Sequence, residues 1–294
     1  MKQDLTAKFC LGTVQLGMKY GIKNELGRQP TNEEAFAVLN AAVTSGIRMF
    51  DTASAYGAAE DVLGRYGLAG TAARIVSKLR PGGADDKESV LAEIHGSLRR
   101  LGAEKLFCYM LHRAEDMERD GVMGGLCEAK TLGLAESIGV SIYKPEEAMQ
   151  AAQDDRIDAI QIPYNVLDQR LDACGFFALA KKNNKLVFAR SVFLQGLLLM
   201  HPNEAEEKVA GSGRCIGRFR EIAAEYGYTP VEAAMLYVFQ HSDIDYIVFG
   251  VDTAEQLAEN IGILGDGRDF LRCHERLWGE FSAVPTKVIQ PNLW

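Results

Sequence analysis

The chain contains the run Ile47-Arg48-Met49-Phe50-Asp51-Thr52-Ala53-Ser54-Ala55-Tyr56-Gly57. Its apolar part ends abruptly at Asp51, and a loop of small residues then presents Tyr56 before a helical pattern resumes at Glu60. Strands of an α/β barrel deliver side chains to an active site in this way, because the residues just past such strands lie together at one end of the barrel. The run therefore predicts a short strand followed by a functional aspartate and tyrosine.

Two later apolar runs end in the same manner. Residues 73–77 lead into Lys78, and residues 106–111 lead into His112. If all three runs are parallel strands of one sheet, the polar residues at their ends face a common cavity. The candidate catalytic residues are therefore Asp51, Tyr56, Lys78 and His112.

Strand-like and helix-like segments alternate along the whole sequence. Besides the three runs above, strands are predicted at residues 9–13, 135–140, 159–162, 186–189 and 246–249. Helices are predicted at residues 85–101, 122–131, 176–183, 218–226 and 231–241, with others begun by Pro145, ending near Asn260, or capped by Thr31 and Glu34. Eight short strands alternating with helices, at a repeat of roughly 30 residues, fit a (β/α)8 barrel or a doubly wound sheet. The strand number and the length of 294 residues favour the TIM barrel, which typically needs about 250 residues.

The sequence has no division into smaller units. Because no Pro/Ser-rich linker or long charge run interrupts it, a single domain spanning residues 1–294 is expected. The pattern loosens at residues 200–217, which we expect to form a long polar loop before the last helices, last strand and a C-terminal tail. Within it, Gly211-Ser212-Gly213 follows no strand and lacks the spacing of a dinucleotide-binding loop, so we expect a flexible lid.

The composition restricts the class of partner. The chain has 32 basic and 40 acidic residues, a net charge of −8, which argues against nucleic acid or an acidic membrane as a partner. No apolar run approaches the roughly 20 residues of a membrane span, and the N-terminus has no signal core. The six cysteines are widely spaced without a Cys-x-x-Cys pair, so neither a metal site nor a disulfide framework is expected. A cytoplasmic protein with a small-molecule partner is the expectation, and the oligomeric state stays open.

The four candidate residues suit chemistry at a carbonyl group. Tyrosine is a weak acid, with an unperturbed pKa of about 10, but a cationic Lys78 beside Tyr56 would lower that pKa. Asp51 could hold the lysine charged and oriented, and His112 could donate a hydrogen bond to a carbonyl oxygen. Lysine is the only good nucleophile of the set, so carbonyl reduction or aldol-type chemistry is the predicted class.

These motifs resemble those of the aldo-keto reductases. The resemblance is carried by Phe50-Asp51-Thr52-Ala53 with Tyr56-Gly57 and Glu60, by Ser77-Lys78, by Leu111-His112-Arg113, and by Gln161, Tyr164-Asn165 and residues 191–198 in the expected order. It covers nearly the whole chain. It implies a (β/α)8 barrel that binds a nicotinamide cofactor, NADP or NAD, and reduces an aldehyde or ketone. Tyr56 would be the general acid, with Lys78 tuning it, Asp51 orienting the lysine and His112 orienting the carbonyl.

The resemblance also implies which residues hold the cofactor. Ser141 and Gln161 match residues that hold the carboxamide, and residues 191–197 match the segment that cradles the pyrophosphate. The implied cofactor-binding residues are Ser141, Gln161, Arg190, Ser191, Phe193, Gln195, Gly196, Gly250, Asp252, Gln256 and Asn260. Two positions depart from the family pattern: Arg190 stands where a stacking tyrosine or tryptophan is usual, and Ile142 where asparagine is frequent. The charge of Arg190 would disfavour an oxidised, cationic nicotinamide ring.

The substrate and the choice of cofactor are less well specified. Tyr20, Arg113 and Asn165 are the expected substrate residues, and with Tyr164, Phe193 and the 200–217 loop they would line a partly polar pocket suited to a sugar-like carbonyl. Residues 250–256 contain no basic residue that could pair with a 2′-phosphate. We therefore expect weak discrimination, with NADH used at least comparably to NADPH. A strong NADPH preference would need a distant arginine, and the candidates are Arg28, Arg214, Arg218 and Arg220.

Two other functions stay open at this stage. A Schiff-base lyase would use Lys78 as its nucleophile, and borohydride would trap its covalent adduct. A non-catalytic subunit would bind the cofactor and regulate a partner, as some relatives in the family do. The remaining histidines, His95, His201, His241 and His274, are expected to be surface or packing residues, although His201 lies in the 200–217 loop that would line the substrate pocket.

Overall fold

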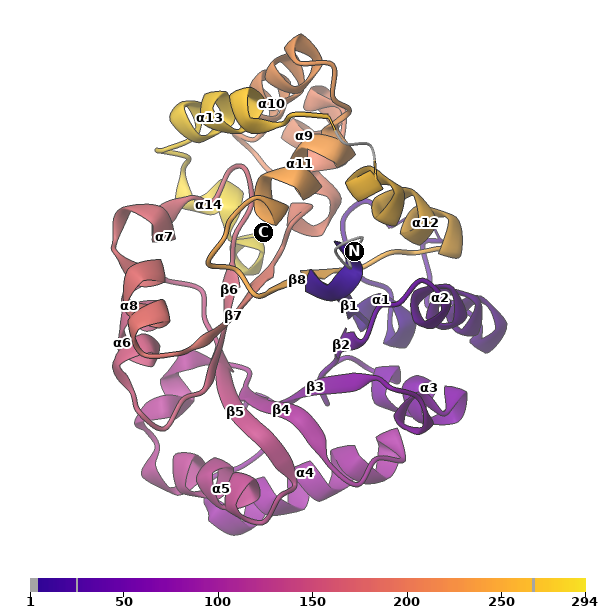
Figure 1. The fold of residues 1–294 in the computed structure, drawn as a ribbon, viewed down its shortest axis with the longest axis vertical. Coiled ribbons are helices and arrows are strands. Elements are labelled where there is room, and N and C mark those ends of the chain that lie inside the picture. Colours follow the sequence, from indigo (N-terminus) through magenta and orange to yellow (C-terminus); the bar gives the residue numbers. More distant parts are fainter. Residues whose placement is uncertain (1–4, 25, 266–267) are drawn as a thin grey trace.

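The computed structural model describes residues 5–24, 26–265 and 268–294, and its eight parallel strands close into a barrel (Figure 1). The strands are β1 (Phe9–Gly12), β2 (Met49–Asp51), β3 (Arg74–Leu79), β4 (Leu106–Leu111), β5 (Ala135–Ser141), β6 (Ala159–Pro163), β7 (Leu186–Arg190) and β8 (Tyr246–Phe249). Each strand pairs with its neighbours in the sequence, and β1 pairs with β8 to complete the ring. The predicted (β/α)8 barrel and its eight strands are confirmed.

Helices surround the strands on the outside of the barrel (Figure 1). They are α1 (Val14–Gly17), α2 (Asn32–Thr44), α3 (Ala59–Tyr66), α4 (Lys87–Leu101), α5 (Asp120–Thr131), α6 (Pro145–Gln153), α7 (Arg170–Ala173), α8 (Phe176–Lys182), α9 (Pro202–Lys208), α10 (Gly213–Glu225), α11 (Pro230–Phe239), α12 (Ala254–Gly262), α13 (Leu271–Glu280) and α14 (Thr286–Ile289). Helices α9, α10 and α13 gather at one end of the long axis. Over the described part of the chain, no helix combines the length and apolarity that a membrane crossing requires.

Side-chain caps fix where several helices begin. The Thr31 side chain accepts a hydrogen bond from the Glu34 N–H, and the Glu34 carboxylate accepts from the Thr31 N–H at 2.7 Å. This is the predicted capping box, which satisfies two amide donors that a helix otherwise leaves unpaired. Helix α11 begins with the same arrangement between Thr229 and Glu232.

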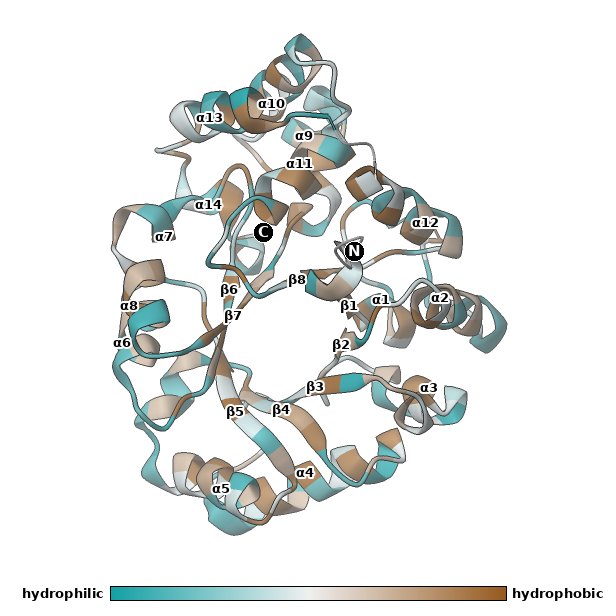
Figure 2. Ribbon diagram, in the orientation of Figure 1, coloured by the Kyte–Doolittle hydropathy of each residue, from teal (hydrophilic) through white to brown (hydrophobic). Residues whose placement is uncertain are grey.

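Two apolar clusters separate the inside of the barrel from the layer under the helices. The larger joins the outward-facing strand residues to the helices, and the smaller fills the barrel interior with Cys10, Met49, Val76, Phe107, Cys108, Met110, Ala159, Phe188 and Val248. In Figure 2, hydrophobic colouring is concentrated on the strands and on α11, and hydrophilic colouring on the outer helices. The barrel is therefore a filled core, so a site can form only above it, at one end.

The prediction of a polar loop at residues 200–217 is wrong. Helix α9 and the start of α10 occupy this segment, and α10 begins at Gly213 rather than at residue 218. The Glu206 carboxylate accepts hydrogen bonds from the Gly211 and Gly213 N–H groups at 2.7 and 2.8 Å. Because the glycine segment is held in this way, it is a helix-to-helix connection and not a free lid.

The remaining corrections concern the C-terminal part and His201. The expected tail contains α13 and α14, and α13 buries Cys273 and Leu277 against the barrel helices. His201 caps α9, where its Nδ1 accepts from the Asn203 N–H at 3.4 Å, and it lies outside the cavity described below. Its imidazole is therefore a helix cap and not a substrate contact.

Candidate active site

One layer of residues sits directly above the apolar interior of the barrel. Side chains alternate along a strand, so the residue two positions after an inward-facing one also faces inward. The pairs of interior residue and following layer residue are Cys10 and Gly12, Met49 and Asp51, Val76 and Lys78, Met110 and His112, Ala159 and Gln161, Phe188 and Arg190, and Val248 and Gly250. The alternation therefore brings the strand-end residues of seven strands to one level of the barrel.

The candidate catalytic residues form a connected chain in this layer. The Lys78 ammonium nitrogen lies 2.6 Å from both carboxylate oxygens of Asp51, and it also donates to the Thr52 carbonyl oxygen at 3.0 Å. It lies 3.4 Å from the Tyr56 hydroxyl oxygen. Lys78 is fully buried, whereas Asp51 and Tyr56 line the cavity. The chain therefore runs from a buried ion pair to a hydroxyl group in the cavity.

The loop between β2 and α3 places Tyr56. Gly57 has a φ of +57°, and a Cβ added there would lie 2.4 Å from the carbonyl oxygen of Gly17. The Ala58 N–H donates to that same oxygen at 3.0 Å. Only glycine combines this backbone conformation with so close an approach, so the loop rests directly on α1 and holds the tyrosine over the barrel.

His112 stands next to Tyr56 in an uncharged form. The two rings meet edge to face, with centres 5.6 Å apart. Burial first, and then the positive charges of Lys78, Arg190 and Arg113, lower the pKa of His112 to about 3. A neutral imidazole carries one N–H, which suits a hydrogen bond to a carbonyl oxygen better than proton transfer.

The expected lowering of the Tyr56 pKa is wrong for this structure. Burial is the largest influence and raises the pKa, the negative charge of Asp51 raises it further, and Arg190 opposes both. Lys78 cannot dominate because its charge is matched by Asp51 at 2.6 Å. Tyr56 is therefore a protonated phenol across the physiological pH range, which is the form that a proton donor requires.

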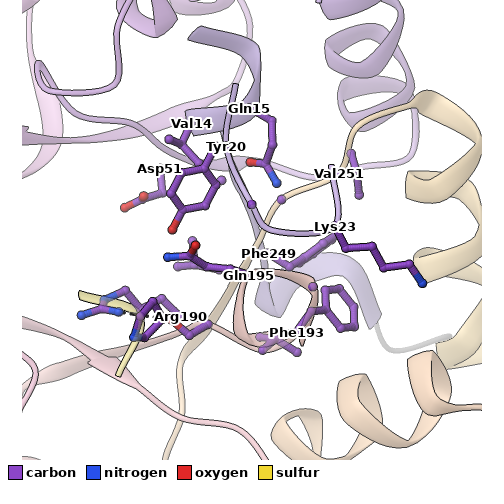
Figure 3. Close-up of a pocket in the computed structure, with 18 of the residues that line it drawn as sticks. Val14, Gln15, Tyr20, Lys23, Asp51, Arg190, Phe193, Gln195, Phe249 and Val251 are labelled. Carbon is purple, nitrogen blue, oxygen red and sulfur yellow. Dashed lines mark hydrogen bonds between the residues drawn. The ribbon is translucent and has the colours of Figure 1, made fainter. Parts of the chain in front are cut away.

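A cavity of about 640 Å³ opens above the layer (Figure 3). This volume is within the range of small-molecule and cofactor sites. Figure 3 shows Tyr20, Asp51 and Arg190 toward one end and Lys23 and Val251 toward the other. All of the expected cofactor-binding residues line it: Ser141, Gln161, Arg190, Ser191, Phe193, Gln195, Gly196, Gly250, Asp252, Gln256 and Asn260.

The two residues expected to hold a carboxamide are partly engaged with the protein. Gln161 Nε2 donates to Asp51 Oδ1 at 2.7 Å, and Ser141 Oγ accepts from Arg190 Nε at 3.3 Å. The Gln161 carbonyl oxygen and the Ser141 hydroxyl hydrogen are not used in these bonds. Each residue therefore keeps one group for a ligand.

The loop after β7 forms a wall of backbone. Ser191, Leu194, Gln195 and Gly196 all have positive φ angles, of 65°, 48°, 55° and 95°. Three of these are not glycine, and such conformations cost about 1–3 kcal/mol each and persist only where the surrounding structure imposes them. Strain of this kind clusters at ligand sites.

The loop after β1 contacts the β7 loop and holds it in place through hydrogen bonds. The Ile22 N–H donates to the Gln195 carbonyl oxygen at 3.1 Å, and Lys23 Nζ donates to the Leu199 carbonyl oxygen at 2.8 Å. A Cβ on Gly196 would lie 2.7 Å from the Cβ of Lys23. These contacts are the surroundings that impose the strained conformation.

The far end of the cavity is formed by the loop after β8 and the start of α12. Thr253 caps the helix, and Gln256 Oε1 accepts from the Asp252 N–H at 2.8 Å. The Asp252 carboxylate accepts from Asn24 Nδ2 at 2.8 Å. The β1 loop therefore reaches both the β7 and the β8 loops.

Two of the three expected substrate residues do not line the cavity. Tyr20 does, but Arg113 is exposed outside it, and Asn165 is fully buried with its Nδ2 bonded to the Ser191 carbonyl oxygen at 3.1 Å. Tyr164 also lies beneath the surface, where its hydroxyl contacts Asp172 at 3.1 Å. Arg113 follows the inward-facing His112, and because side chains alternate along a strand, Arg113 points away from the barrel interior.

Sequence reasoning missed several cavity residues, of which the polar ones are Thr13, Gln15, Lys23, Tyr143, Glu259 and Asn292. The rule applied to β2, β3 and β4, that residues just past a strand reach the cavity, also holds for Gln15 and Tyr143 and would have found them. No local signal marks Asn292, which comes from the C-terminal segment.

The four candidate phosphate-binding arginines are not equivalent. Arg220 lines the cavity, and its Nη1 donates to the Met200 carbonyl oxygen at 3.3 Å. Arg28 pairs with Glu34 at 2.7 Å, and Arg218 pairs with Glu280 at 3.2 Å. Arg28, Arg214 and Arg218 are absent from the cavity wall.

Comparison with known proteins identifies the class to which this barrel belongs. Residues 8–266 match the sequence profile of the Aldo/keto reductase family, and the chain is a member of that family. It is therefore an oxidoreductase of a family that uses NAD(P)H, and it acts on small carbonyl compounds.

Individual relatives are distant. The chain is 25% identical to the L-glyceraldehyde 3-phosphate reductase of Escherichia coli, over 85% of this chain and 84% of the relative. It is 24% identical to the NADH-specific methylglyoxal reductase of Escherichia coli, over 60% of each protein. Among solved structures, the holo form of an aldo-keto reductase from Bacillus halodurans superposes with a TM-score of 0.76 at 18% identity, covering 92% of this chain and 91% of that one. This last likeness supports the fold alone.

Proposed function

We propose that this protein reduces the carbonyl group of a small hydroxylated aldehyde or ketone, with Tyr56 as the proton donor. The observation that carries the proposal is the chain from Asp51 through Lys78 to the Tyr56 hydroxyl, with His112 beside it at the base of the cavity. When bound, the reduced nicotinamide supplies the hydride. With hydride delivered to the carbonyl carbon, the Tyr56 proton would go to the carbonyl oxygen to give an alcohol, and the resulting Tyr56 phenolate would regain a proton from water.

The cavity fits an elongated polar cofactor. Its wall carries two buried polar atoms that have no hydrogen-bond partner among the described residues, Gln15 Oε1 and His112 Nδ1. The strained β7 loop contributes Ser191, Phe193, Gln195 and Gly196 to the cavity wall, and α12 contributes Gln256 and Asn260. We assign the nicotinamide to Ser141 and Gln161, the pyrophosphate to residues 191–197, and the adenine side to Gln256 and Asn260.

The roles of the four residues follow from their contacts. His112, neutral and with its ring against Tyr56, would donate a hydrogen bond that polarises the carbonyl. Tyr56, protonated, would give its proton as negative charge develops on the oxygen, and the Lys78 ammonium would then stabilise the phenolate across 3.4 Å. Asp51 fixes the position of Lys78. The interactions of His112, Tyr56 and Lys78 would strengthen as negative charge develops on the carbonyl oxygen, which is the condition for lowering a barrier.

Turnover of the reduced cofactor tests this proposal. We expect NADH or NADPH to be oxidised in the presence of glyceraldehyde, methylglyoxal or short aldoses, with the alcohol formed in equal amount. This panel follows the names of two relatives, which reduce L-glyceraldehyde 3-phosphate and methylglyoxal. If no aldehyde or ketone oxidises either cofactor, the proposal fails.

The rival use of Lys78 as a Schiff-base nucleophile has less support. Its ammonium is fully buried and donates to Asp51 and Thr52, so a carbonyl compound in the cavity meets Tyr56 first. Borohydride added with substrate should leave the mass of the protein unchanged. A mass increase on Lys78 would favour the lyase.

We further propose that NADH and NADPH are used with similar efficiency. Asp252 and Glu259 line the adenine end, and the nearest cations of the wall, Lys23 and Arg220, already donate to the carbonyl oxygens of Leu199 and Met200. Titration of both cofactors by fluorescence should give dissociation constants within about a hundredfold, or about 2.7 kcal/mol. A larger preference for NADPH that Arg220→Gln abolishes would identify Arg220 as the phosphate ligand and overturn this proposal.

A further inference from the structure

Arg190 ends strand β7, and its guanidinium forms part of the cavity wall. Its Nε donates to Ser141 Oγ at 3.3 Å, its Nη1 to Ser191 Oγ at 3.1 Å, and its Nη2 to the Ile142 carbonyl oxygen at 2.9 Å. The guanidinium also stacks on the ring of Tyr143, 4.3 Å from the ring centre. These contacts hold the cation in one orientation between the ends of β5 and β7.

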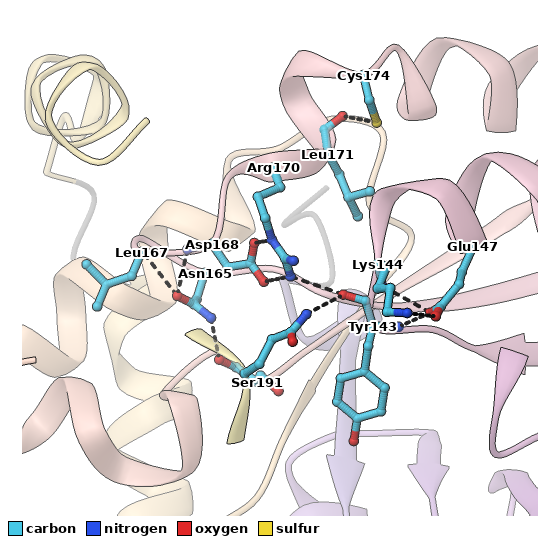
Figure 4. A network of polar contacts seen from close by, with 11 residues as sticks. Tyr143, Lys144, Glu147, Asn165, Leu167, Asp168, Arg170, Leu171, Cys174 and Ser191 are labelled. Carbon is cyan, nitrogen blue, oxygen red and sulfur yellow. Dashed lines mark hydrogen bonds and ion pairs between the residues drawn. The ribbon is translucent and has the colours of Figure 1, made fainter. Parts of the chain in front are cut away.

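The groups that hold this guanidinium are themselves fixed by a polar network (Figure 4). The Tyr143 N–H donates to Glu147 at 2.8 Å, and the Tyr143 carbonyl oxygen accepts from Arg170 at 3.1 Å. The Ser191 carbonyl oxygen accepts from Asn165 at 3.1 Å. Asn165 therefore supports the wall from behind rather than touching a ligand. Such support preorganises the guanidinium, so little further ordering is needed when it binds a ligand.

The charge of Arg190 is not balanced by the protein. Lys78, the other cation at this level of the barrel, has the Asp51 carboxylate at 2.6 Å. By contrast, none of the ion pairs found among residues 5–24, 26–265 and 268–294 involves Arg190, whose three hydrogen bonds all go to uncharged oxygens. A guanidinium has five N–H groups, so two remain for a ligand. Carboxylates and phosphates are the groups that use such donors best.

Arg190 is close enough to the reacting end to act on the substrate. After burial and Lys78, its charge is the next influence that lowers the pKa of His112, and it opposes the rise in the pKa of Tyr56. Figure 3 places it toward the same end of the cavity as Tyr20 and Asp51. A compound whose carbonyl oxygen meets Tyr56 and His112 can therefore present a nearby substituent to Arg190.

We propose that Arg190 is a specificity-determining residue that selects carbonyl substrates bearing an anionic group, a carboxylate or a phosphate ester, over neutral ones of similar size. The inference rests on the proposed carbonyl reduction and specifies its substrate class. An anion is favoured because it pairs with the unbalanced cation, and a neutral hydroxyl gains less from the same donors. The charge-assisted bonds should raise kcat/KM at least about tenfold for the anionic partner of a matched pair.

Matched pairs of substrates test the proposal. Glyceraldehyde 3-phosphate is compared with glyceraldehyde, and succinic semialdehyde with 4-hydroxybutanal, so that the two anions are tried separately. The wild-type protein should prefer the anionic member of at least one pair by about tenfold or more. Arg190→Gln should bring that ratio close to one, mainly by changing KM. Arg190→Lys keeps the charge but loses the paired N–H donors of the guanidinium, so its ratio should lie between those of the wild type and Arg190→Gln. The pair that responds distinguishes a phosphate from a carboxylate.

Arg113→Gln is the matched control. Arg113 is exposed outside the cavity, yet its charge also acts on the pKa of His112. If Arg113→Gln lowers the ratio of kcat/KM values as much as Arg190→Gln does, the preference for anions comes from long-range electrostatic attraction and not from a contact with Arg190. The proposal is then wrong. It is also wrong if the wild type prefers neither anion, or if Arg190→Gln slows both members of a pair equally while changing the affinities for oxidised and reduced cofactor.

A binding measurement separates this proposal from the proposed function. Oxamate and inorganic phosphate, which cannot be reduced, are titrated calorimetrically into the protein saturated with reduced cofactor. Binding of either that Arg190→Gln weakens about tenfold, while Arg113→Gln does not, supports the anion site even if no carbonyl compound is turned over. Turnover of neutral aldehydes with no Arg190-dependent anion binding would overturn the anion site and leave the reductase intact. Thermal unfolding of each variant confirms that it folds.

Discussion

The β2–β4 wall of the cavity presents side chains held by other buried side chains, whereas the β7–β8 wall presents backbone held by cross-links from the β1 loop. On the first wall, Lys78 and Asp51 fix Tyr56 through contacts of 2.6 and 3.4 Å. On the second, Ser191, Leu194, Gln195 and Gly196 adopt left-handed conformations, and Ile22 and Lys23 hold this loop in place. The first arrangement depends on residue type and suits chemistry. The second depends on backbone position and suits binding.

This comparison predicts that changes on the first wall reduce the rate and changes on the second reduce affinity. The largest effect is expected for Tyr56→Phe, which removes the proton donor but little surface. General acid catalysis typically contributes 10²–10⁴-fold, and kcat should fall by that amount while the dissociation constant of the reduced cofactor changes less than threefold or so. Stopped-flow reduction and fluorescence titration measure the two.

Tyr20→Phe is the control for Tyr56→Phe, because Tyr20 lines the same cavity and burial raises its pKa to about 12. It should lose less than about tenfold in rate, since only one of the two hydroxyls is linked to Lys78. Equal losses in the two variants, or a Tyr56→Phe protein with more than about a tenth of the wild-type rate, would remove Tyr56 from the mechanism.

The next largest effect is expected for Lys78→Met, on stability as well as rate. Lys78 is fully buried, and removing it leaves the Asp51 carboxylate buried with Gln161 as its one remaining side-chain donor among the residues that the structure describes. Breaking a buried ion pair on one side typically costs about 3–5 kcal/mol. Asp51→Asn should also slow the reaction, but less, because Asp51 acts on the tyrosine through Lys78.

A double variant separates the two consequences. Lys78→Met combined with Asp51→Leu replaces both charges by apolar groups, so urea unfolding should recover much of the lost stability, while kcat stays low. Recovery of activity together with stability would mean that the ion pair only maintains the fold. That outcome would contradict the inference that the side chains of the β2–β4 wall take part in the chemistry.

His112 makes a smaller, pH-dependent contribution. Its pKa of about 3 in the folded protein lies below the 6.5 of an unfolded chain, so between these values the unfolded state binds more protons and stability rises with pH. The contribution is complete above pH 6.5 and declines below it. From pH 7.5 to 4.5 the wild type should lose about 2–3 kcal/mol through this group.

Urea unfolding at the two pH values checks this, with His112→Gln expected to remove the loss. His95→Gln is the control, because His95 is exposed on α4. A His112→Gln protein with the same acid sensitivity as wild type would mean that the imidazole is charged in the fold.

The smallest effect is expected on the second wall. Gly196→Ala introduces a Cβ at a φ of +95°, 2.7 Å from the Cβ of Lys23, so the loop must shift. Reduced-cofactor affinity should weaken by about 1–2 kcal/mol, or roughly 5–30-fold, while kcat at saturation changes little. Gly175→Ala is the matched control, with a φ of +77° and no atom within 4 Å of the added Cβ. It should lower stability without altering cofactor affinity.

The residues of the first wall could be predicted from their own types and positions, whereas those of the second were predicted only through the resemblance to the aldo-keto reductases. Asp51, Lys78 and His112 each end an apolar run, and their side-chain types restrict the chemistry, so position and role follow together. Arg190 and Gly250 occupy equivalent positions on β7 and β8, but their types say little without the cavity around them. The hydrogen bond from Asn24 to Asp252 joins residues far apart in the chain, and no local sequence pattern predicts it.

The errors have physical causes too. Residues 200–217 have the polar composition of a loop, but Ile216, Phe219 and Ile222 begin a helical apolar stripe inside that segment, and Glu206 holds the glycines before it. The expected lowering of the Tyr56 pKa was wrong because burial of the hydroxyl and the negative charge of Asp51, which both raise this pKa, were not taken into account. Asn165 was expected to line a partly polar substrate pocket, yet it turns inward to hold Ser191.

The pairing of β1 with β8, which closes the barrel, affects how the chain folds while it is being synthesised. Leu11 pairs with Phe249, so the first strand has one unpaired edge until the last strand has been synthesised. At ~5–20 residues per second, that strand leaves the ribosome roughly 10–50 seconds after the first. All four proposed catalytic residues are synthesised in the early part of this interval, before the residues of the β7–β8 wall. The nascent protein therefore carries an incomplete sheet with exposed edges, which can pair with other chains, and its vulnerability to aggregation should end only when residues 246–249 emerge.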